Sequence, residues 1–202
     1  HGLCCSQIWE HKGNPAGQRL TANRTIESFY KWSGGGRIPI FCDTTSCTHT
    51  LLFETGGDIL TPENREKYKQ LKIMDITQWL KEVVLPRIKV IRPKNRILLH
   101  PTCSCQIMGL TPVLLDIARK CAREVILPDN WGCCGASGDR GFIFPELSDS
   151  ATRDERDEIG HESFDGCYSL ARTCEIAMQD HIEQPYESIV YLVDETIQDQ
   201  GT

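Results

Sequence analysis

The chain has 202 residues, 40% hydrophobic and 25% charged, so it has the composition of a globular protein and can bury a core. Its formal net charge of −6 argues against a nucleic acid or an anionic membrane as the main partner. No apolar run approaches the roughly 18 residues of a membrane span, and the first residues lack the basic start and apolar run of a signal peptide.

The first half of the chain is predicted to be mostly helical. Asn14 and Pro15 supply an N-cap and a first-turn proline for a helix through Trp32, which the sequence SGGG ends. The segment RIPIF, residues 37–41, is predicted to be a short buried strand, although its proline weakens that prediction. Three further helices are predicted, near Ser46, over residues 61–71 and after Asp75.

The second half alternates apolar strands with helices. The strands are RILLHP, residues 96–101, and EVILP, residues 124–128. Helices are predicted from Thr111, after Pro145, around Cys174 and over residues 187–197, where apolar side chains recur every four residues. The alternation predicts an α/β fold with mostly parallel sheets and flanking helices.

The 11 cysteines are the unusual feature of the composition. Their number is odd, and two pairs are adjacent in sequence, Cys4–Cys5 and Cys133–Cys134. Disulfide frameworks belong mostly to much shorter secreted chains, and adjacent cysteines bond to each other only with strain. The pattern therefore favours reduced, metal-binding cysteines in the cytoplasm over disulfides.

The two cysteine pairs belong to an internal repeat. LCCSQIWEHKGNPA parallels GCCGASGDRGFIFP, with 41 residues between Cys5 and Cys47 and 39 between Cys134 and Cys174. The segment HPTC precedes the second pair, whereas the first copy has no such segment before it. We therefore expect two halves, a truncated first repeat over residues 1–92 and a second repeat over residues 93–202, in a piece of a longer protein.

Four cysteines of the second repeat form the main candidate metal site. In a parallel sheet, the loops after the strands converge at one edge, where ligands bind. Four thiolates match the ligand count of zinc or an iron–sulfur cluster, and glycines in the turn, at positions 132, 135 and 138, suit a backbone that approaches thiolate charge. The predicted ligands are Cys103, Cys133, Cys134 and Cys174 in the second repeat, and Cys4, Cys5 and Cys47, with Cys42 nearby, in the first.

The motifs HPTC, GCCGASGDRGFIFPEL, SATRDE and RTCEIAM resemble the cysteine-rich CCG domain. That domain occurs in duplicate in heterodisulfide reductase and in the iron–sulfur proteins of glycolate and glycerol-3-phosphate dehydrogenases, and it closes large FAD-linked D-lactate and D-2-hydroxyacid dehydrogenases. The resemblance is greatest to the last group and spans nearly the whole chain. It implies an electron-transfer module that lies C-terminal to an FAD domain and a ferredoxin-like segment.

The chain departs from the fullest pattern of that family at two positions. Thr44 and Ala171 stand where the family has the first cysteine of a Cys-x-x-Cys motif used for five-cysteine clusters. A four-ligand iron–sulfur cluster, a zinc ion and a vacant site all stay open, as does a contribution from Cys42 or Cys167. Neither a dinucleotide-binding glycine motif nor a ferredoxin cysteine run is present, so we expect this chain alone neither to bind FAD nor to oxidise a hydroxyacid.

The resemblance leads to one main expectation and two alternatives. The main expectation is the C-terminal iron–sulfur electron-transfer region of an FAD-linked D-2-hydroxyacid dehydrogenase, in the cytoplasm, with peripheral attachment to the inner membrane left open. Its partners would be the FAD and ferredoxin-like domains of the parent chain and an acceptor such as quinone. The alternatives are a structural zinc module and a redox-active pair of thiols at Cys133 and Cys134.

Several other residues have competing interpretations. Cys121 is expected in the core because it lies on an apolar helix face, whereas Cys105 and Cys167 either contact the ligands or are bystanders. His100 is either structural or a ligand or hydrogen-bond partner of the metal centre. The acidic run SDSATRDERDEIGHE is interpreted as a solvated helix face.

Overall fold

The computed structural model describes residues 3–198, which form two compact units divided between Ile76 and Thr77. Residues 77–92, which the sequence analysis grouped with the first repeat, belong to the second unit.

The first unit contains mostly helices and one pair of strands. Its elements are α1 (Gln7–His11), α2 (Pro15–Trp32), β1 (Ile40–Cys42), α3 (Thr45–His49), a π-helical turn (Thr50–Glu54), α4 (Pro62–Tyr68), β2 (Ile73–Asp75) and the start of α5 (Ile76–Trp79). The predicted bounds of α2 are confirmed. Its N-cap Asn14 accepts a hydrogen bond from the backbone nitrogen of Gly17 at 2.9 Å, and Pro15 occupies the first turn.

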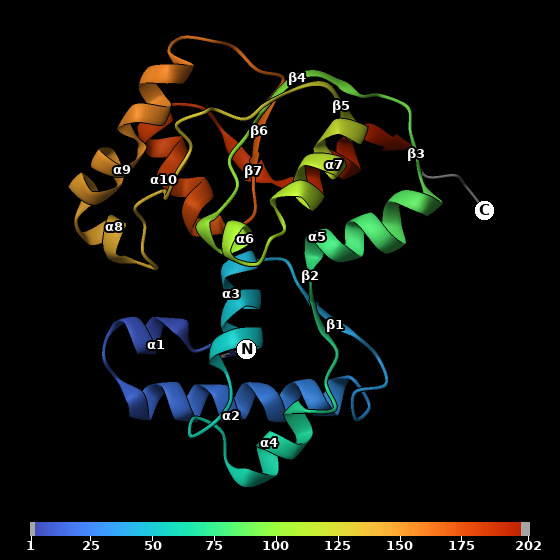
Figure 1. Cartoon of the computed structure of the whole chain (residues 1–202), viewed down its shortest axis with the longest axis vertical. Helices are drawn as coiled ribbons and strands as arrows, with labels where there is room; N and C mark the ends of the chain where they lie inside the picture. Colours follow the sequence, from blue (N-terminus) through green and yellow to red (C-terminus); the bar gives the residue numbers. More distant parts are fainter. Residues whose placement is uncertain (1–2, 199–202) are drawn as a thin grey trace. The chain divides into compact units, whose positions relative to one another are not determined.

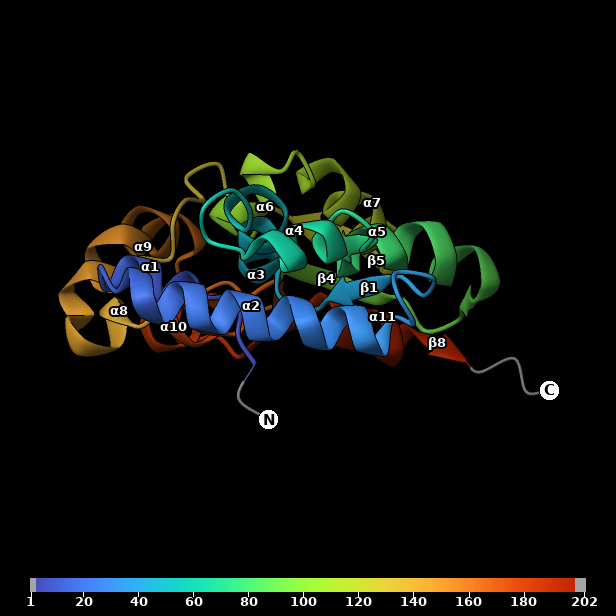
Figure 2. The same ribbon diagram turned by 90° about the horizontal axis from the view of Figure 1, so that it is seen from below.

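Helix α2 organises the packing of this unit. It lies against α1 and α4 (Figures 1 and 2), and its buried Ala22 and Ile26 form a small core with Leu60. Strands β1 and β2 pair in parallel, with Ile40 opposite Ile73. The strand predicted at residues 37–41 begins only at Ile40, because the proline at position 39 cannot donate a ladder hydrogen bond. Strand β2 and helix α1 were not predicted.

The second unit is built around a four-stranded parallel sheet with strand order β5-β4-β6-β7. These strands are β4 (Lys94–Leu99), β5 (Ala122–Ile126), β6 (Gly166–Ser169) and β7 (Tyr186–Ser188), and their pairs are all parallel. A separate short antiparallel pair joins β3 (Lys89–Val90) to β8 (Ile197–Gln198). The expected α/β fold with parallel sheets and flanking helices is thus confirmed.

Helices cover both faces of the four-stranded sheet (Figure 1). On one face, α7 (Thr111–Cys121) and α11 (Ile189–Thr196) pack together, α7 on β5 and α11 on β6 and β7. On the other face, α9 (Pro145–Ile159) packs on α10 (Arg172–Ile182), which contacts β6 and β7. The remaining helical segments of the unit are π-helical Leu80–Val84, a 3-10 turn (Leu85–Arg87), α6 (Cys103–Ile107) and α8 (Arg140–Ile143). The central strand residues Ile97, Leu98 and Leu99 are fully buried between the two helical layers.

The helix predictions of the second half are confirmed, but the strands β3, β6, β7 and β8 and the short helices α6 and α8 were not predicted. Strands β6 and β7 have three or four residues each, and their sequences GCYS and YES contain no apolar run. The final helix is also shorter than expected, because the segment before Ile189 belongs to β7 and Ile197 begins β8. Strand β5 begins two residues earlier than predicted.

The order of elements repeats between the two halves of the chain. In each half a cysteine pair is followed by a short helix, a long helix, a short strand, a cysteine-bearing helix, another short strand and a helix. The first half differs in having the π-helical turn and α4 between its cysteine-bearing helix and its second strand. The two short strands pair in parallel in both cases, β1 with β2 and β6 with β7. The sequence repeat is therefore matched by a repeat of secondary structure.

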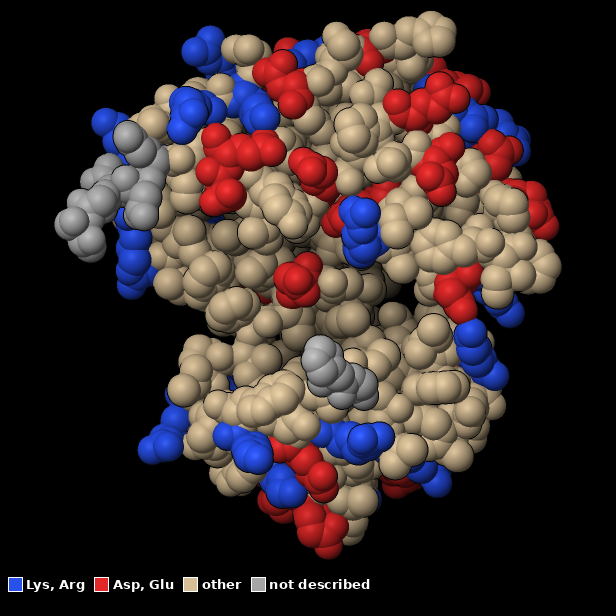
Figure 3. Space-filling model, turned by 180° about the vertical axis from the view of Figure 1, so that it is seen from behind, with Lys and Arg blue, Asp and Glu red and all other residues tan. Residues whose placement is uncertain are grey.

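Charged side chains are mixed on the molecular surface. The face drawn in Figure 3 carries acidic and basic side chains interspersed with uncharged residues. None of the helices that the structure describes has the length and hydropathy needed to cross a membrane.

Candidate metal centre

Three adjacent strands of the second unit deliver four cysteines to the same edge of the sheet. Cys103 begins α6 shortly after β4, and Cys133 and Cys134 lie in the turn after β5. Cys174 is the third residue of α10, which follows β6. Because β5, β4 and β6 are neighbours and parallel, their carboxyl ends bring the three segments together.

Cys174 lies within the first turn of α10, where backbone N–H groups are not used by the helix. The strand that carries it there, β6, was not predicted.

The four sulfur atoms form a continuous chain of contacts. The Sγ atoms of Cys134 and Cys174 lie 3.0 Å apart, with both residues buried. The thiols of Cys103 and Cys134 each hydrogen-bond to the sulfur of Cys133. Cys103 and Cys133 are exposed, so one side of the group is open to solvent. All four are free cysteines.

These contacts concentrate negative charge on Cys133. The thiols of Cys103 and Cys134 donate to its sulfur and lower its pKa far below the ordinary thiol value, and the backbone nitrogen of Gly135, 3.4 Å away, acts in the same direction. The pKa values of Cys103 and Cys134 are raised, chiefly because each donates to Cys133. A metal that binds here must therefore displace protons from the donor thiols.

A glycine backbone shapes the turn that holds Cys133 and Cys134. Gly135 and Gly138 both have φ of +74°, a left-handed conformation that other residues adopt only with strain. Gly132 was also expected to be required, but it has no positive φ and a Cβ there would meet open space. The conformational argument thus applies to Gly135 and Gly138 only.

The donor set has the chemistry of a thiolate metal centre, but the side chains must move to bind one. Two thiolates on a tetrahedral zinc are about 3.8 Å apart, as follows from a Zn–S distance of about 2.3 Å. The 3.0 Å between Cys134 and Cys174 is shorter than that, and a cluster of several metal atoms needs wider spacing still. As they stand, no three His, Cys, Asp or Glu side chains within residues 3–198 are arranged to hold one metal ion.

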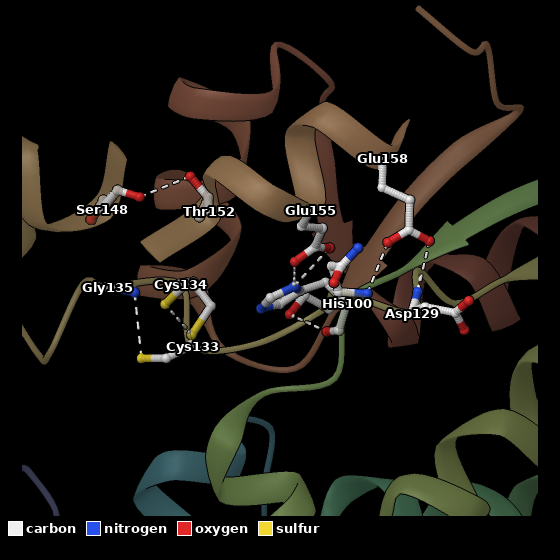
Figure 4. Close-up of polar contacts among 12 residues, drawn as sticks. His100, Asp129, Cys133, Cys134, Gly135, Ser148, Thr152, Glu155 and Glu158 are labelled. Atoms are coloured by element: carbon white, nitrogen blue, oxygen red, sulfur yellow. Dashed lines mark hydrogen bonds and ion pairs between the residues drawn. The ribbon is translucent and has the colours of Figure 1, made fainter. Parts of the chain in front are cut away.

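A buried histidine–carboxylate pair lies beside the cysteines (Figure 4). Nδ1 of His100 is 3.1 and 3.0 Å from the two carboxylate oxygens of Glu155. Their side chains are only 1% and 2% exposed. His100 is one of the predicted candidates, whereas Glu155 belongs to the run predicted to be a solvated helix face.

The assignment of the acidic run to a solvated face is wrong for one stripe of α9. Ser148, Thr152, Glu155 and Ile159 are buried. Their spacings of four, three and four residues place them on the same side of a helix. That periodicity is a sequence signal for a buried helix face, although three of the four side chains are polar.

The first unit contains a smaller group of the same kind. The thiol of Cys5 donates to the sulfur of Cys47, which raises the pKa of Cys5 and lowers that of Cys47. Cys4 hydrogen-bonds to Cys5, and burial is the main reason that its pKa is raised. Cys42 interacts electrostatically with Cys5, and its pKa rises to about 11, mainly through burial. In both units the second cysteine of the pair therefore contacts the cysteine of the helix that follows the next strand, which is Cys47 in α3 and Cys174 in α10.

Three cysteines of the second unit stay outside the group of contacting thiols. Cys121 is fully buried, as predicted, and hydrogen-bonds to Thr196. Cys105 is buried with its Sγ 3.9 Å from the hydroxyl oxygen of Thr111. Cys167 lies in the hydrophobic core next to the site, where burial raises its pKa to about 12.

No protein-family model matches the chain, and no curated protein matches it with significant sequence similarity. The likeness to the CCG domain consequently rests on the sequence motifs themselves.

Proposed function

We propose that this chain is the C-terminal iron–sulfur electron-transfer region of an FAD-linked dehydrogenase that oxidises a D-2-hydroxyacid of the D-lactate type. The observation that carries the proposal is the convergence of Cys103, Cys133, Cys134 and Cys174 at one edge of a parallel sheet. The dehydrogenase part comes from the likeness of the motifs to the CCG domain. The repeated order of elements in the two halves agrees with the duplication typical of that domain.

An iron–sulfur cluster held by these four thiolates would accept and release single electrons. The chain itself supplies the surroundings. Cys134 and Cys174 are enclosed by core residues and exclude water on one side, whereas Cys103 and Cys133 leave the other side accessible to a redox partner. The backbone nitrogen of Gly135 stabilises negative charge on the sulfur of Cys133.

The partners follow from the same proposal. Electrons would come from the FAD domain of the parent protein through a ferredoxin-like segment and leave to an acceptor such as quinone. The free state of all the described cysteines is consistent with a reducing compartment such as the cytoplasm.

A structural zinc site is the second candidate. The short distance between Cys134 and Cys174 is closer to the sulfur spacing around one zinc ion than to the wider spacing that a cluster requires. Such a site would stabilise the sheet edge without carrying electrons.

Anaerobic reconstitution with iron and sulfide, followed by visible and EPR spectroscopy, separates these candidates. We expect the wild-type chain to acquire the absorption and EPR signal of a cluster and the Cys134→Ala variant to lose both. Cys121→Ala is the matched control, since it removes a buried thiol outside the group and should leave the spectra unchanged. A wild-type chain that takes up zinc but no iron, or a Cys134→Ala variant with wild-type spectra, would refute the redox role.

A further inference from the structure

The pair formed by His100 and Glu155 has a geometry that its role in packing does not require. Both carboxylate oxygens of Glu155 lie within 3.1 Å of Nδ1 of His100, so this nitrogen is the donor of the ring toward Glu155. The backbone oxygen of His100 accepts a hydrogen bond from the hydroxyl of Ser169 at 2.9 Å. The ring of Tyr186 stands edge-on to the imidazole ring, with 6.4 Å between centroids.

The second ring nitrogen is buried and unsatisfied. Nε2 of His100 is shielded from solvent and has no hydrogen-bond partner within the part of the chain that the structure describes. Leaving such a group unpaired in the interior costs about 1–3 kcal/mol. A ring locked at Nδ1 and unpaired at Nε2 presents a lone pair in one fixed direction.

That direction is toward the cysteines. In Figure 4 the Nε2 side of the His100 ring faces Cys133 and Cys134, whereas the Nδ1 side faces Glu155. The chain also places His100 only three residues before Cys103.

We propose that Nε2 of His100 is a nitrogen donor to the metal centre of the second unit and that Glu155 is the carboxylate that orients it. Histidines that bind metals commonly donate their other ring N–H to a carboxylate, which fixes the tautomer and the ring orientation. His100 and Glu155 have this arrangement, with the free nitrogen on the side that faces Cys133 and Cys134. The inference rests on the proposed function only in requiring that these thiols bind a metal.

Zinc alone is the probe for this inference, because it needs no redox chemistry. X-ray absorption of the full chain loaded anaerobically with zinc should give a mixed shell, with nitrogen at about 2.0–2.1 Å and sulfur at about 2.3 Å. Competition with a chelator should show weaker zinc binding for His100→Asn, whose side-chain amide can still donate to Glu155 in place of Nδ1. Glu155→Gln should lose about 10- to 100-fold in zinc affinity, and His100→Asn at least as much.

His181→Asn is the matched control, since it removes a half-buried histidine whose partner is Asp149 rather than a cysteine. An all-sulfur zinc shell in the wild-type chain overturns the inference whether or not the variants fold. So does a His100→Asn variant with wild-type zinc affinity.

Different results refute the two proposals. If zinc binding is lost in Cys134→Ala and the zinc shell includes nitrogen, but no iron–sulfur cluster forms, the electron-transfer role is refuted and the histidine donor is supported. If Cys134→Ala binds zinc as tightly as wild type, both proposals are refuted.

Discussion

Replacing Gly135 with alanine tests whether the turn that holds Cys133 and Cys134 requires a glycine. With φ of +74°, an alanine there costs about 1–2 kcal/mol for the left-handed backbone alone. Its Cβ would also lie 2.6 Å from the backbone oxygen of Leu147 and from Cα of Ser148. Because both are backbone atoms, the turn or α9 must shift, at the about 1–3 kcal/mol typical of overpacking. We therefore expect the free energy of unfolding to fall by about 2–5 kcal/mol.

Gly109→Ala is the control for this prediction. Gly109 has a similar φ of +68°, but a Cβ there would meet no atom within 4 Å, so only the backbone cost of about 1–2 kcal/mol applies. The assay is urea unfolding of the reduced, metal-free chain, followed by circular dichroism. Equal urea midpoints for the two variants would show that the close approach of the turn to α9 does not constrain this site.

Three further predictions concern the surroundings of the two cysteine groups. Burial raises the folded-state pKa of Cys167 from 9.0 to about 12, so the stability it contributes is full below pH 9 and is lost as the pH rises toward 12. Urea midpoints should fall less steeply over that range in Cys167→Ala than in wild type, and equal slopes would contradict the assignment. Glu155→Ala should cost about 1–3 kcal/mol in the metal-free chain, because it leaves the buried Nδ1 donor of His100 without its partner, whereas Asp154→Ala at an exposed neighbouring position should cost little. In metal titrations Cys174→Ser should abolish the tightest binding and Cys47→Ser should preserve it, because no counterpart of Cys103 lies in the described part of the first unit; the reverse order would place the main centre in the first unit.

Local sequence signals predicted the helices well because their ends are determined by nearby residues. Asn14 and Pro15 start α2, and Pro112 and Pro145 lie in the first turns of α7 and α9. Apolar runs predicted β4 and β5 for a similar reason, since buried parallel strands are continuously hydrophobic. Strands β6 and β7 have no comparable signal. They are strands because β4 and its neighbours supply hydrogen-bond partners, which lie far away in the chain.

The sequence by itself determined which cysteines were candidates, because adjacent pairs and the repeat spacing single them out. Only the tertiary structure decided which thiols meet. Cys105 follows Cys103 by two residues, yet positions two apart on a helix face different directions, and its side chain is buried near Thr111.

Burial of Glu155 is also a tertiary property. A run rich in acidic and basic residues is ordinarily solvated. The carboxylate of Glu155 can be buried because His100, which directly follows β4, pairs with it. Local sequence patterns thus predict the helices and identify the candidate ligands. The partner of each buried polar group, and the direction in which the histidine points, depend on contacts between residues 55 or more positions apart, which no local pattern encodes.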